Sequence, residues 1–410
     1  MFVIYQFFIS LILIISPLII CIRLVNGKED KKRFKEKFSL IDRKSVKGKT
    51  IWFHAASVGE IMSIVEILRY YQKKRDIKTI LVTTTTLSSA RIVKKLKLNK
   101  VIHQFFPIDH FIIVKKFLNH WKPKIAIFLE SEIWPSMFYQ LFNKKIPLIL
   151  LNARLTKKSF DRWMMIKNFA KKIFYLIKKS YPQNQQTKFF LKKLSNKNSD
   201  QLGNLKFINN KLEIKNISNK KIIKNLAKYK VWVAASTHQG EELLAAKTHI
   251  LLKKKQKNLI TIIIPRHLDK IHKIVNEIKE LNLNVTTYSS NQKNFKNTDI
   301  YIVDTFGLSR DFYAIASTVF LGKSIFYKGG QNPLEAARLN CNILHGPNVD
   351  NFRDIYKYLH ELKIAKKVNS ISDLISRIEF RKNYTNAVKL NQLGNKIYKQ
   401  TIKELDSHIN

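Results

Sequence analysis

Residues 328–336 read Lys328-Gly329-Gly330-Gln331-Asn332-Pro333-Leu334-Glu335-Ala336, a glycine turn that runs into a helix started by a proline. Glycines let a phosphate approach the main chain closely, and the first turn of a helix offers unpaired N–H groups to an anion. Glu335 would then accept hydrogen bonds from ribose hydroxyls, as an acidic residue does in dinucleotide folds. An ordinary helix cap explains the same residues, so this stretch alone leaves two interpretations open.

Length and composition indicate a two-domain protein. The chain has 410 residues, which is too long for one ordinary core and predicts domains of roughly 150 to 200 residues each. Its hydrophobic content of 45% is enough to fold both. Cys21 and Cys341 provide neither a disulfide framework nor metal-ligand spacing, which fits a reducing compartment.

The formal net charge of +46 raises the question of nucleic-acid binding. The lysines are scattered through Asn- and Ile-rich segments, however, and the sequence carries no stacking-aromatic or base-reading motif. We therefore expect no nucleic-acid partner. A positive surface also attracts anionic lipid headgroups or a phosphorylated glycolipid, at about 1 kcal/mol per basic residue close to the membrane.

The N-terminus predicts a membrane anchor. Residues Phe2 to Leu24 are almost wholly apolar, and about 20 such residues span a bilayer. A cleaved signal peptide needs a basic start and a small-residue cleavage site, and this segment has neither. Basic residues follow at Arg23, Lys28, Lys31, Lys32, Arg33 and Lys35. The positive-inside rule then keeps the rest of the chain in the cytoplasm, and a buried core helix is the alternative.

From Thr50 onward, short β-rich runs alternate with helical patterns, which predicts parallel sheets wound by helices. We expect a first series of strands at residues 51–54, 79–83, 102–106, 125–129 and 148–151, and a second at 231–235, 260–264, 300–303, 318–321 and 342–344. Polar residues follow the strands, at the sheet edge where open α/β folds bind ligands.

These elements divide the chain into an anchor, two Rossmann-like domains and a linker. We place the anchor at residues 1–26, the first domain at 27–208, the linker at 209–221 and the second domain at 222–410. We expect a last helix at about residues 384–405, and the sequence leaves open which of the two domains it packs on. Two similar α/β domains on one linker are expected to face each other across a cleft, which suits a two-substrate reaction.

Acidic residues follow two strands of the first domain. Glu60 ends the run His54-Ala55-Ala56-Ser57-Val58-Gly59-Glu60, where a carboxylate can remove a proton from an attacking hydroxyl. The spacing of Ser57 and Glu60 equally fits a capping box, and this motif alone favours the cap. Glu130 and Glu132 end another strand and suggest charge stabilisation or substrate binding, with a helix-dipole role as the alternative. Arg154 offers a guanidinium for a phosphate or carboxylate.

The second domain also ends its strands with polar residues. Ser236 and Thr237 close one strand, and Pro265 and Arg266 close the next with a fixed cation for a phosphate. Gly307 lets the backbone face a base or ribose. His238 and His267 lack zinc-ligand spacing, and no D-x-D pair follows a strand, so we expect neither a metal ion nor a metal-chelated nucleotide sugar.

Nine motifs in chain order resemble those of the 3-deoxy-D-manno-octulosonic acid (Kdo) transferases of lipopolysaccharide assembly. They are F-H-A-A-S-V-G-E (53–60), F-L-E-S-E-I-W-P (128–135), L-N-A-R-L (151–155), G-N-L-K-F (203–207), A-A-S-T-H (234–238), I-P-R-H (264–267), V-D-T-F-G (303–307), G-G-Q-N-P-L-E-A (329–336) and G-P-N-V-D-N-F-R-D (346–354). The resemblance extends from the anchor to about Asp354. One such motif is weak, but nine in order are highly specific.

The resemblance implies a GT-B glycosyltransferase whose first domain binds the acceptor and whose second binds a CMP-sugar. The reaction implied is an inverting, metal-independent transfer of Kdo from CMP-Kdo to a lipid A precursor (lipid IVA), without a cofactor, at the cytoplasmic face of the inner membrane. The residues implied are Glu60 as general base, Glu130 and Lys206 for the transition state, and Pro265, Arg266, Phe306, Gly307, Leu308, Asn332, Pro333, Leu334 and Glu335 for CMP.

Further candidates surround these positions. We assign phosphate or sugar contacts to Ser236, Thr237, Gly329, Gly330 and Gln331, and acceptor contacts to Ser57, Glu132 and Arg154. Three positions depart from the family pattern, which commonly has His at Gln331, Glu at Leu308 and Glu at Gln239. Gln331 donates a hydrogen bond but carries no charge, so these changes bear on efficiency more than on reaction type.

Two other functions stay open from the sequence. One is a GT-B transferase that uses a UDP-sugar on a lipid acceptor, and competition between UDP and CMP separates it from the CMP-Kdo reaction. The other is a non-catalytic basic protein that binds membranes or nucleic acid, which would show strongly salt-dependent RNA binding and no turnover.

Overall fold

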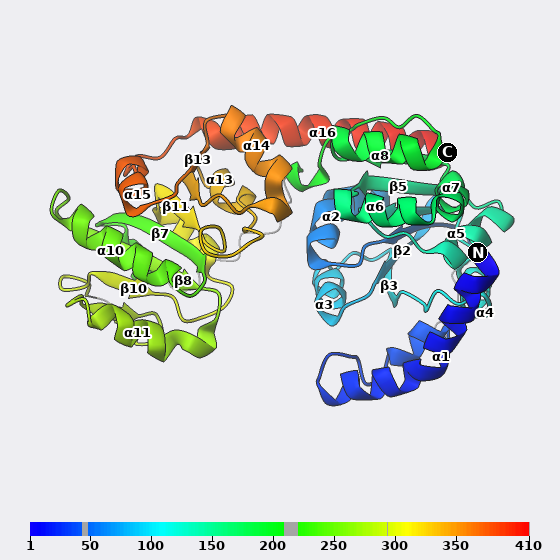
Figure 1. The fold of residues 1–410 in the computed structure, drawn as a ribbon, viewed down its shortest axis with the longest axis horizontal. Helices are drawn as coiled ribbons and strands as arrows, with labels where there is room; N and C mark the ends of the chain where they lie inside the picture. The colour runs from blue at the N-terminus through cyan, green and yellow to red at the C-terminus, as the bar shows by residue number, and fades with distance from the viewer. Residues whose placement is uncertain (43–47, 209–219, 293, 410) are drawn as a thin grey trace. The chain divides into compact units, whose positions relative to one another are not determined.

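The computed structural model describes residues 1–42, 48–208, 220–292 and 294–409, and these fold into two compact units (Figure 1). The first unit is Met1–Lys211 with Leu393–Asn410, and the second is Leu212–Gln392. The predicted linker, 209–221, lies almost wholly outside the described residues. The roles of the two units in binding an acceptor and a donor stay predictions.

The first unit contains a six-stranded parallel sheet with strand order β3-β2-β1-β4-β5-β6, the order of a doubly wound Rossmann sheet. Its strands are β1 (Lys49–His54), β2 (Ile77–Thr84), β3 (Val101–Phe105), β4 (Ile125–Leu129), β5 (Leu148–Ala153) and β6 (Lys179–Pro182). Its helices are α1 (Phe2–Val25), α2 (Val58–Lys73), α3 (Leu87–Lys95), α4 (Phe111–Trp121), α5 (Pro135–Asn143), α6 (Lys157–Met165), α7 (Lys167–Tyr175) and α8 (Gln185–Ser195), with short 3₁₀ turns η1 (Phe34–Phe38) and η2 (Leu205–Phe207).

The second unit contains a seven-stranded parallel sheet with strand order β13-β12-β11-β7-β8-β10-β9. Its strands are β7 (Lys230–Thr237), β8 (Leu259–Pro265), β9 (Val285–Thr287), β10 (Ile300–Ile302), β11 (Thr318–Leu321), β12 (Asn342–His345) and β13 (Ala365–Lys367). Its helices are α9 (Lys220–Leu226), α10 (Glu241–Lys253), α11 (Ile271–Lys279), α12 (Ser309–Ile315), α13 (Leu334–Arg338), α14 (Arg353–Glu361) and α15 (Ile371–Arg377), with 3₁₀ turns η3 (Leu268–Lys270) and η4 (Asp350–Phe352).

Helices on both faces of each sheet bury the central strands, which explains their continuous runs of Ile, Leu and Val. In the first unit Trp52 lies at the centre of the core, where its indole packs against Phe117 and Phe128 and its N–H donates to the Thr83 hydroxyl (2.9 Å). The core therefore holds the carboxyl end of β1 rigid, and with it the segment that leads to Glu60.

The last helix, α16 (Thr385–Ile409), leaves the second unit, and its residues from Leu393 onward belong to the first. The sequence-based boundary, which gave 222–410 to the second domain, is therefore wrong at its end. Side chains explain the attachment, because the Asp406 carboxylate accepts hydrogen bonds from the hydroxyls of Tyr70 (2.6 Å) and Tyr71 (3.1 Å) on α2.

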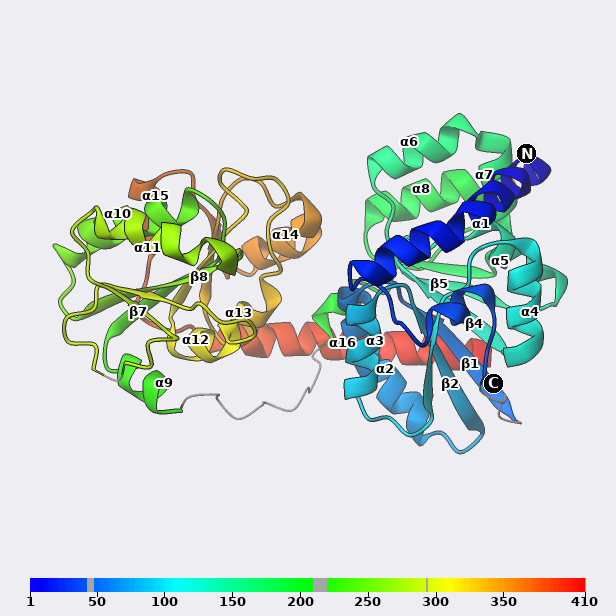
Figure 2. The same ribbon diagram turned by 90° about the horizontal axis from the view of Figure 1, so that it is seen from below.

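Helix α1 is long and apolar enough to cross a membrane, and most of its surface is exposed. In Figure 2 it runs along the first unit, and its N-terminal end lies beside α5 and α7. The sequence therefore predicted the helix itself correctly, to within one residue at its end.

We predict that Gly394→Ala weakens the attachment of α16. A Cβ at Gly394 would lie 2.3 Å from the Phe207 carbonyl oxygen, which is backbone and cannot move aside cheaply. The clash outweighs the gain in helix propensity of about 1 kcal/mol, so we expect a net loss of about 1–2 kcal/mol in the free energy of unfolding. Denaturant unfolding in detergent measures it. The exposed Asn395→Ala on the same helix is the control, and equal stability of the two variants would contradict the close contact.

Candidate active site

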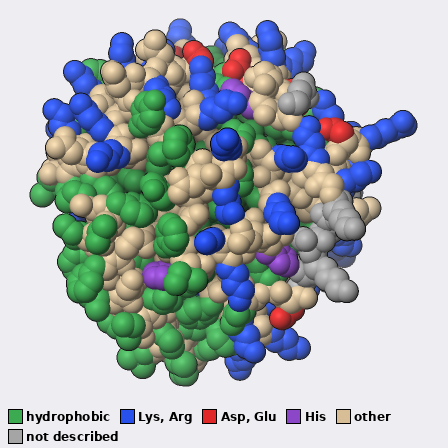
Figure 3. All heavy atoms as spheres, turned by 90° about the vertical axis from the view of Figure 1, so that its right-hand side faces the viewer, with side chains coloured by type: hydrophobic (Ala, Val, Ile, Leu, Met, Phe, Trp, Pro, Cys, Tyr) green, Lys and Arg blue, Asp and Glu red, His purple; other side chains and the backbone are tan. Residues whose placement is uncertain are grey.

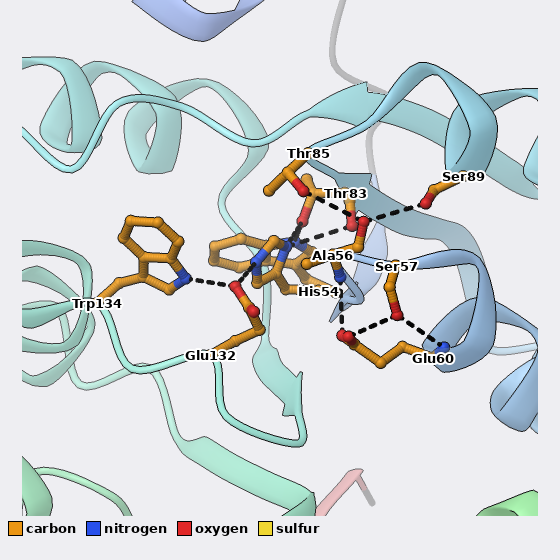
Figure 4. A network of polar contacts seen from close by, with 10 residues as sticks. His54, Ala56, Ser57, Glu60, Thr83, Thr85, Ser89, Glu132 and Trp134 are labelled. Atoms are coloured by element: carbon orange, nitrogen blue, oxygen red, sulfur yellow. Dashed lines mark hydrogen bonds and ion pairs between the residues drawn. The ribbon is translucent and has the colours of Figure 1, made fainter. Parts of the chain in front are cut away.

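Glu60 lies in the first turn of α2 with its carboxylate fixed by two donors. The Ser57 hydroxyl donates to Oε1 (2.7 Å) and the Ala56 N–H donates to Oε2 (2.9 Å), while the Glu60 N–H donates back to Ser57 Oγ (3.3 Å). Ser57 is thus the N-cap of α2. The capping interpretation of the motif is therefore correct. The same contacts hold the buried Glu60 carboxylate at the edge of the sheet where the strands end (Figure 4).

An ion pair joins the end of β4 to the 3₁₀ turn η2. Lys206 Nζ contacts Glu130 Oε1 at 2.7 Å, with both side chains less than one-fifth exposed. Asn152 connects them, because its amide donates to Glu130 Oε1 (3.5 Å) and its carbonyl oxygen accepts the Leu205 N–H (3.0 Å). The Asn204 side chain in turn accepts the Lys206 N–H (3.0 Å). The G-N-L-K motif is thereby fixed against Glu130.

Glu132 belongs to a second polar network at the same edge. Its Oε2 accepts a hydrogen bond from the Trp134 indole N–H (2.9 Å) and lies 3.1 Å from His54 Nε2 (Figure 4). His54 Nδ1 lies 2.9 Å from the Thr83 hydroxyl, and the His54 ring stacks on Phe106. Desolvation opposes ionisation of Glu132, but the hydrogen bonds from His54 and Trp134 outweigh it and lower its pKa.

The three carboxylates interact electrostatically. Burial is the largest effect on Glu60, and the negative charges of Glu130 and Glu132 add to it, so that its pKa rises to about 7 against the lowering effect of the Ser57 and Ala56 hydrogen bonds. A carboxylate that titrates near neutrality is suited to accept a proton at physiological pH. This is the property expected of a general base.

In the second unit, a buried carboxylate organises the loops at the carboxyl edge. Glu241 is fully buried and accepts four backbone N–H groups, from His238 (3.0 Å), Lys323 (2.7 Å), Ser324 (3.0 Å) and Ile325 (3.2 Å). It thereby joins the loop after β7 to the loop after β11. Ser236, next to the last residue of β7, has a left-handed backbone (φ 53°) at a break in the strand's register, and strain of this kind is typical of functional sites.

The predicted CMP-contacting residues form three loops of the second unit. The Arg266 N–H donates to the Thr237 carbonyl (3.0 Å), so the Arg266 turn after β8 lies beside the loop after β7, and the Arg266 side chain is exposed. In the next loop Phe306 is 71% exposed and Gly307 has φ 86°, whereas Leu308 is buried. An exposed phenylalanine on a fixed turn is suited to contact a planar base.

The glycine turn differs from its sequence-based description in one respect. Helix α13 has five residues and begins after Pro333, which is its N-cap, so the helix is too short to provide a strong dipole. Asn332 Oδ1 accepts the Leu334 N–H (3.1 Å), as an ordinary cap would. Although Glu335 is exposed as a residue, protein atoms around its carboxylate raise its pKa, and the charges of Arg310 and Arg338 oppose that rise.

Comparisons with known proteins decide the family. Residues 32–209 match the family model described as 3-deoxy-D-manno-octulosonic-acid transferase (kdotransferase). The Kdo transferase of Rickettsia bellii is 36% identical over 92% of this chain and 90% of its own length, and that of Haemophilus influenzae is 30% identical over 90% and 88%.

The chain belongs to the Kdo transferase family. It is therefore a glycosyltransferase that transfers Kdo in lipopolysaccharide synthesis. Solved structures support the GT-B-like fold, since HepE from Anabaena in complex with UDP and glucose aligns with a TM-score of 0.54 over 88% of this chain and 100% of its own, at 12% identity. A UDP-N-acetylglucosamine 2-epimerase from Listeria monocytogenes, described as putative, aligns with a TM-score of 0.55 over 85% and 90%, at 10% identity.

The structure of this Kdo transferase brings Glu60, Glu130 and Lys206 to one edge of the first unit. The Arg154 N–H donates to the Glu130 carbonyl (3.3 Å), which places its main chain there too. The Ser57 hydroxyl is hydrogen-bonded to Glu60, and the Glu132 carboxylate contacts His54 and Trp134. Contacts of Ser57 and Glu132 with an acceptor stay predictions. The roles of the predicted CMP, phosphate and sugar contacts in the second unit stay predictions too.

Sequence reasoning missed three residues that fix the sites. Asn152 was inside a quoted motif, L-N-A-R-L, but had no assigned role, and Glu241 follows the A-A-S-T-H motif by three residues. His54 opens the motif that ends at Glu60. A polar residue at a strand end was the available signal for Asn152 and His54, and an acidic residue in the first turn of a helix was the signal for Glu241. Among the described residues no three His, Cys, Asp or Glu side chains group to hold a metal ion; the metal-free reaction stays a prediction.

We predict that replacing Glu60 with glutamine changes the pH dependence of stability. Because folding raises the pKa of Glu60 from 4.5 to about 7, protonated Glu60 stabilises the fold below pH 4.5, and that contribution is lost as the pH rises through 7. Glu60→Gln cannot ionise, so its stability relative to the native protein should increase from pH 5 to pH 8 by up to roughly 3 kcal/mol. Urea unfolding at several pH values measures this difference, and a pH-independent difference would contradict the raised pKa.

Proposed function

We propose that this enzyme transfers Kdo from CMP-Kdo to a lipid A precursor, lipid IVA, at the cytoplasmic face of the inner membrane. The reaction is metal-independent and inverts the anomeric centre. One observation carries the proposal: a buried carboxylate, Glu60, whose pKa lies near 7, at the same sheet edge as a buried carboxylate–lysine pair.

Glu60 acts as the general base. An acceptor hydroxyl attacks the anomeric carbon of Kdo, its proton passes to a Glu60 oxygen, and the bond from that carbon to the phosphate oxygen breaks to release CMP. The Ser57 and Ala56 donors orient the carboxylate and leave each oxygen a further lone pair. Proton removal of this kind contributes about 10²- to 10⁴-fold in rate.

Glu130 and Lys206 stabilise the transition state. The lysine neutralises Glu130 in the resting enzyme and provides a positive charge when negative charge develops on the leaving phosphate. Asn152 acts as a positioning residue, since it fixes the carboxylate and the segment before the lysine with one side chain. A preorganised charge needs no reorganisation during the reaction, which is the main source of electrostatic catalysis.

The second unit holds the donor. Arg266 would bind the CMP phosphate, the exposed Phe306 would contact the cytosine ring, and Glu335 would accept hydrogen bonds from the ribose hydroxyls. The protein atoms around the exposed Glu335 raise the pKa of its carboxyl in the free enzyme, and two donors from a ribose would favour the ionised form. Fixed cations take the place of Mg²⁺ on the leaving phosphate.

We predict that Glu60→Ala lowers kcat by about 10²- to 10⁴-fold, since the base is lost while the donor site is in the other unit. Mass spectrometry of the product formed from CMP-Kdo and lipid IVA measures turnover, and calorimetry with CMP should show unchanged affinity. In the native enzyme kcat/KM should rise about tenfold per pH unit up to about pH 7 and then level off, because only the ionised carboxylate accepts a proton.

The control is Glu66→Ala on the same helix, which should keep near-native turnover. Full activity of Glu60→Ala would remove Glu60 from the mechanism. Turnover of a UDP-sugar in place of CMP-Kdo would instead contradict the assignment of the donor, but not the role of Glu60 as general base.

We predict that Arg266→Ala weakens CMP binding at least tenfold, because a charge-assisted hydrogen bond to phosphate is worth about 1.5–3 kcal/mol. Glu335→Gln should also weaken the binding of CMP. It should weaken the binding of 2′-deoxy-CMP less, since that nucleotide already lacks one ribose hydroxyl. Isothermal titration measures both, with the exposed Lys270→Ala as the control. Displacement of the bound nucleotide by UDP rather than CMP would contradict the assignment of the donor.

A further inference from the structure

Helix α1 contacts the first unit through a polar stripe. The Tyr5 hydroxyl donates to Asp109 Oδ2 (2.7 Å), the Gln6 amide donates to Ser136 Oγ (2.6 Å), and Gln6 Oε1 accepts the Phe111 N–H (3.3 Å). One turn further, Ser10 Oγ lies 3.4 Å from His110 Nε2. The Phe2 ring packs on Tyr139 of α5 (4.8 Å between centroids). These residues share one face of the helix, because side chains three to four positions apart lie above one another.

The opposite face of α1 is apolar and uncovered. Val3, Phe7, Phe8, Ile14, Leu18 and Ile22 are each more than half exposed. Side chains of this size seldom face water in such a continuous row. The stripe of polar residues is therefore turned to the protein and the row of large apolar residues is turned outward, which is the pattern of a helix that lies between a protein and a lipid phase.

Both ends of α1 are attached to the same unit. At its far end, Arg23 pairs with Glu29 (3.1 Å), and Glu29 also pairs with Lys37. Arg33 then donates to the His103 carbonyl on β3 (2.9 Å). A 24-residue helix is about 36 Å long and the hydrocarbon core about 30 Å thick. If α1 crossed that core, its first turns would lie on the side of the bilayer opposite to the unit that they contact.

We propose that α1 lies in the plane of the membrane, docked on the first unit by its polar stripe and embedded in lipid by its apolar face, and that it does not span the bilayer. This replaces the single-pass arrangement expected from the sequence. It is independent of the reaction proposed above, because it rests on contacts of α1 alone.

The surface around α1 fits an anionic bilayer as the occupant. Exposed lysines follow the helix at once, at Lys28, Lys31, Lys32 and Lys35. Beyond Tyr139, a groove of about 1290 Å³ formed by α5, α6, α7 and α8 is lined by Phe142, Phe160, Met164, Tyr175 and Phe189 and also by lysines. Figure 3 shows hydrophobic side chains spread over this end of the first unit with Lys and Arg around them. Apolar area and basic charge together bind anionic lipid.

The decisive experiment compares the two ends of the full-length protein. A protease-cleavable tag is placed before Met1 in one version and after Asn410 in another, and membranes are prepared as right-side-out spheroplasts and as inverted vesicles. We expect carbonate-resistant membrane association and cleavage of both tags in the same preparation only. Cleavage of the two tags in opposite preparations, or loss of the protein from the membrane fraction, would overturn the proposal.

A second measurement tests the docking contacts. Tyr5→Phe combined with Gln6→Leu removes the stripe's hydrogen bonds to Asp109 and Ser136 and makes the helix more apolar, which a spanning helix would tolerate. In-plane docking predicts a thermal midpoint lower by about 2–4 °C per lost bond in detergent. Val3→Leu, on the outward face, is the matched control. A midpoint equal to that of the control would contradict the docking, since the buried Asp109 depends on Tyr5 for one of its donors.

Discussion

The pairing of Glu130 with Lys206 is the interaction on which the first unit's site depends. Three carboxylates, those of Glu60, Glu130 and Glu132, lie at one edge of a sheet, where burial and the negative charges of Glu130 and Glu132 raise the pKa of Glu60. Removing one partner from a buried ion pair leaves an uncompensated charge, at about 3–5 kcal/mol. Each of the three carboxylates is accordingly matched with its own donors, and Glu60 has only neutral ones. Burial therefore dominates at Glu60 and raises its pKa, whereas the contacts with His54 and Trp134 outweigh burial at Glu132 and lower its pKa.

The backbone at the strand ends carries part of this arrangement. Glu130, Asn152 and Ser236 all have φ between 50° and 53°, a left-handed conformation that disfavours side chains other than glycine. Such strain persists only where surrounding contacts over-determine it. In the first unit Asn152 makes two hydrogen bonds, to Glu130 and from the Leu205 N–H, and in the second unit Glu241 accepts four backbone N–H groups from the segments after β7 and β11. In each unit a buried polar side chain thus fixes the backbone close to a left-handed residue at a strand end.

The sequence predicted the buried strands well and the edge strands poorly. Ten strands were placed correctly because parallel strands covered on both faces carry continuous apolar runs, such as Ile125–Leu129. Strands β6, β9 and β13 were missed, since they are at most four residues long and lie at sheet edges or carry polar residues. The pairing of Asn152 with Glu130 depends on β5 lying beside β4, and no local pattern contains that fact.

The orientation of α1 was hidden for a similar reason. Along the chain, Gln6 and Ser10 interrupt an apolar run that includes Tyr5, and the three residues form a stripe only when their partners on other elements are known. Those partners lie close to the chemistry. Ser136, which accepts from Gln6, is two residues beyond Trp134, whose indole holds Glu132. A membrane-embedded α1 would therefore hold the edge that carries Glu130 and Glu132 next to the lipid surface, where a glycolipid acceptor presents its sugar. Ser136 lies in the first turn of α5, so its contact with Gln6 connects α1 to the short loop between β4 and α5 that carries Glu132.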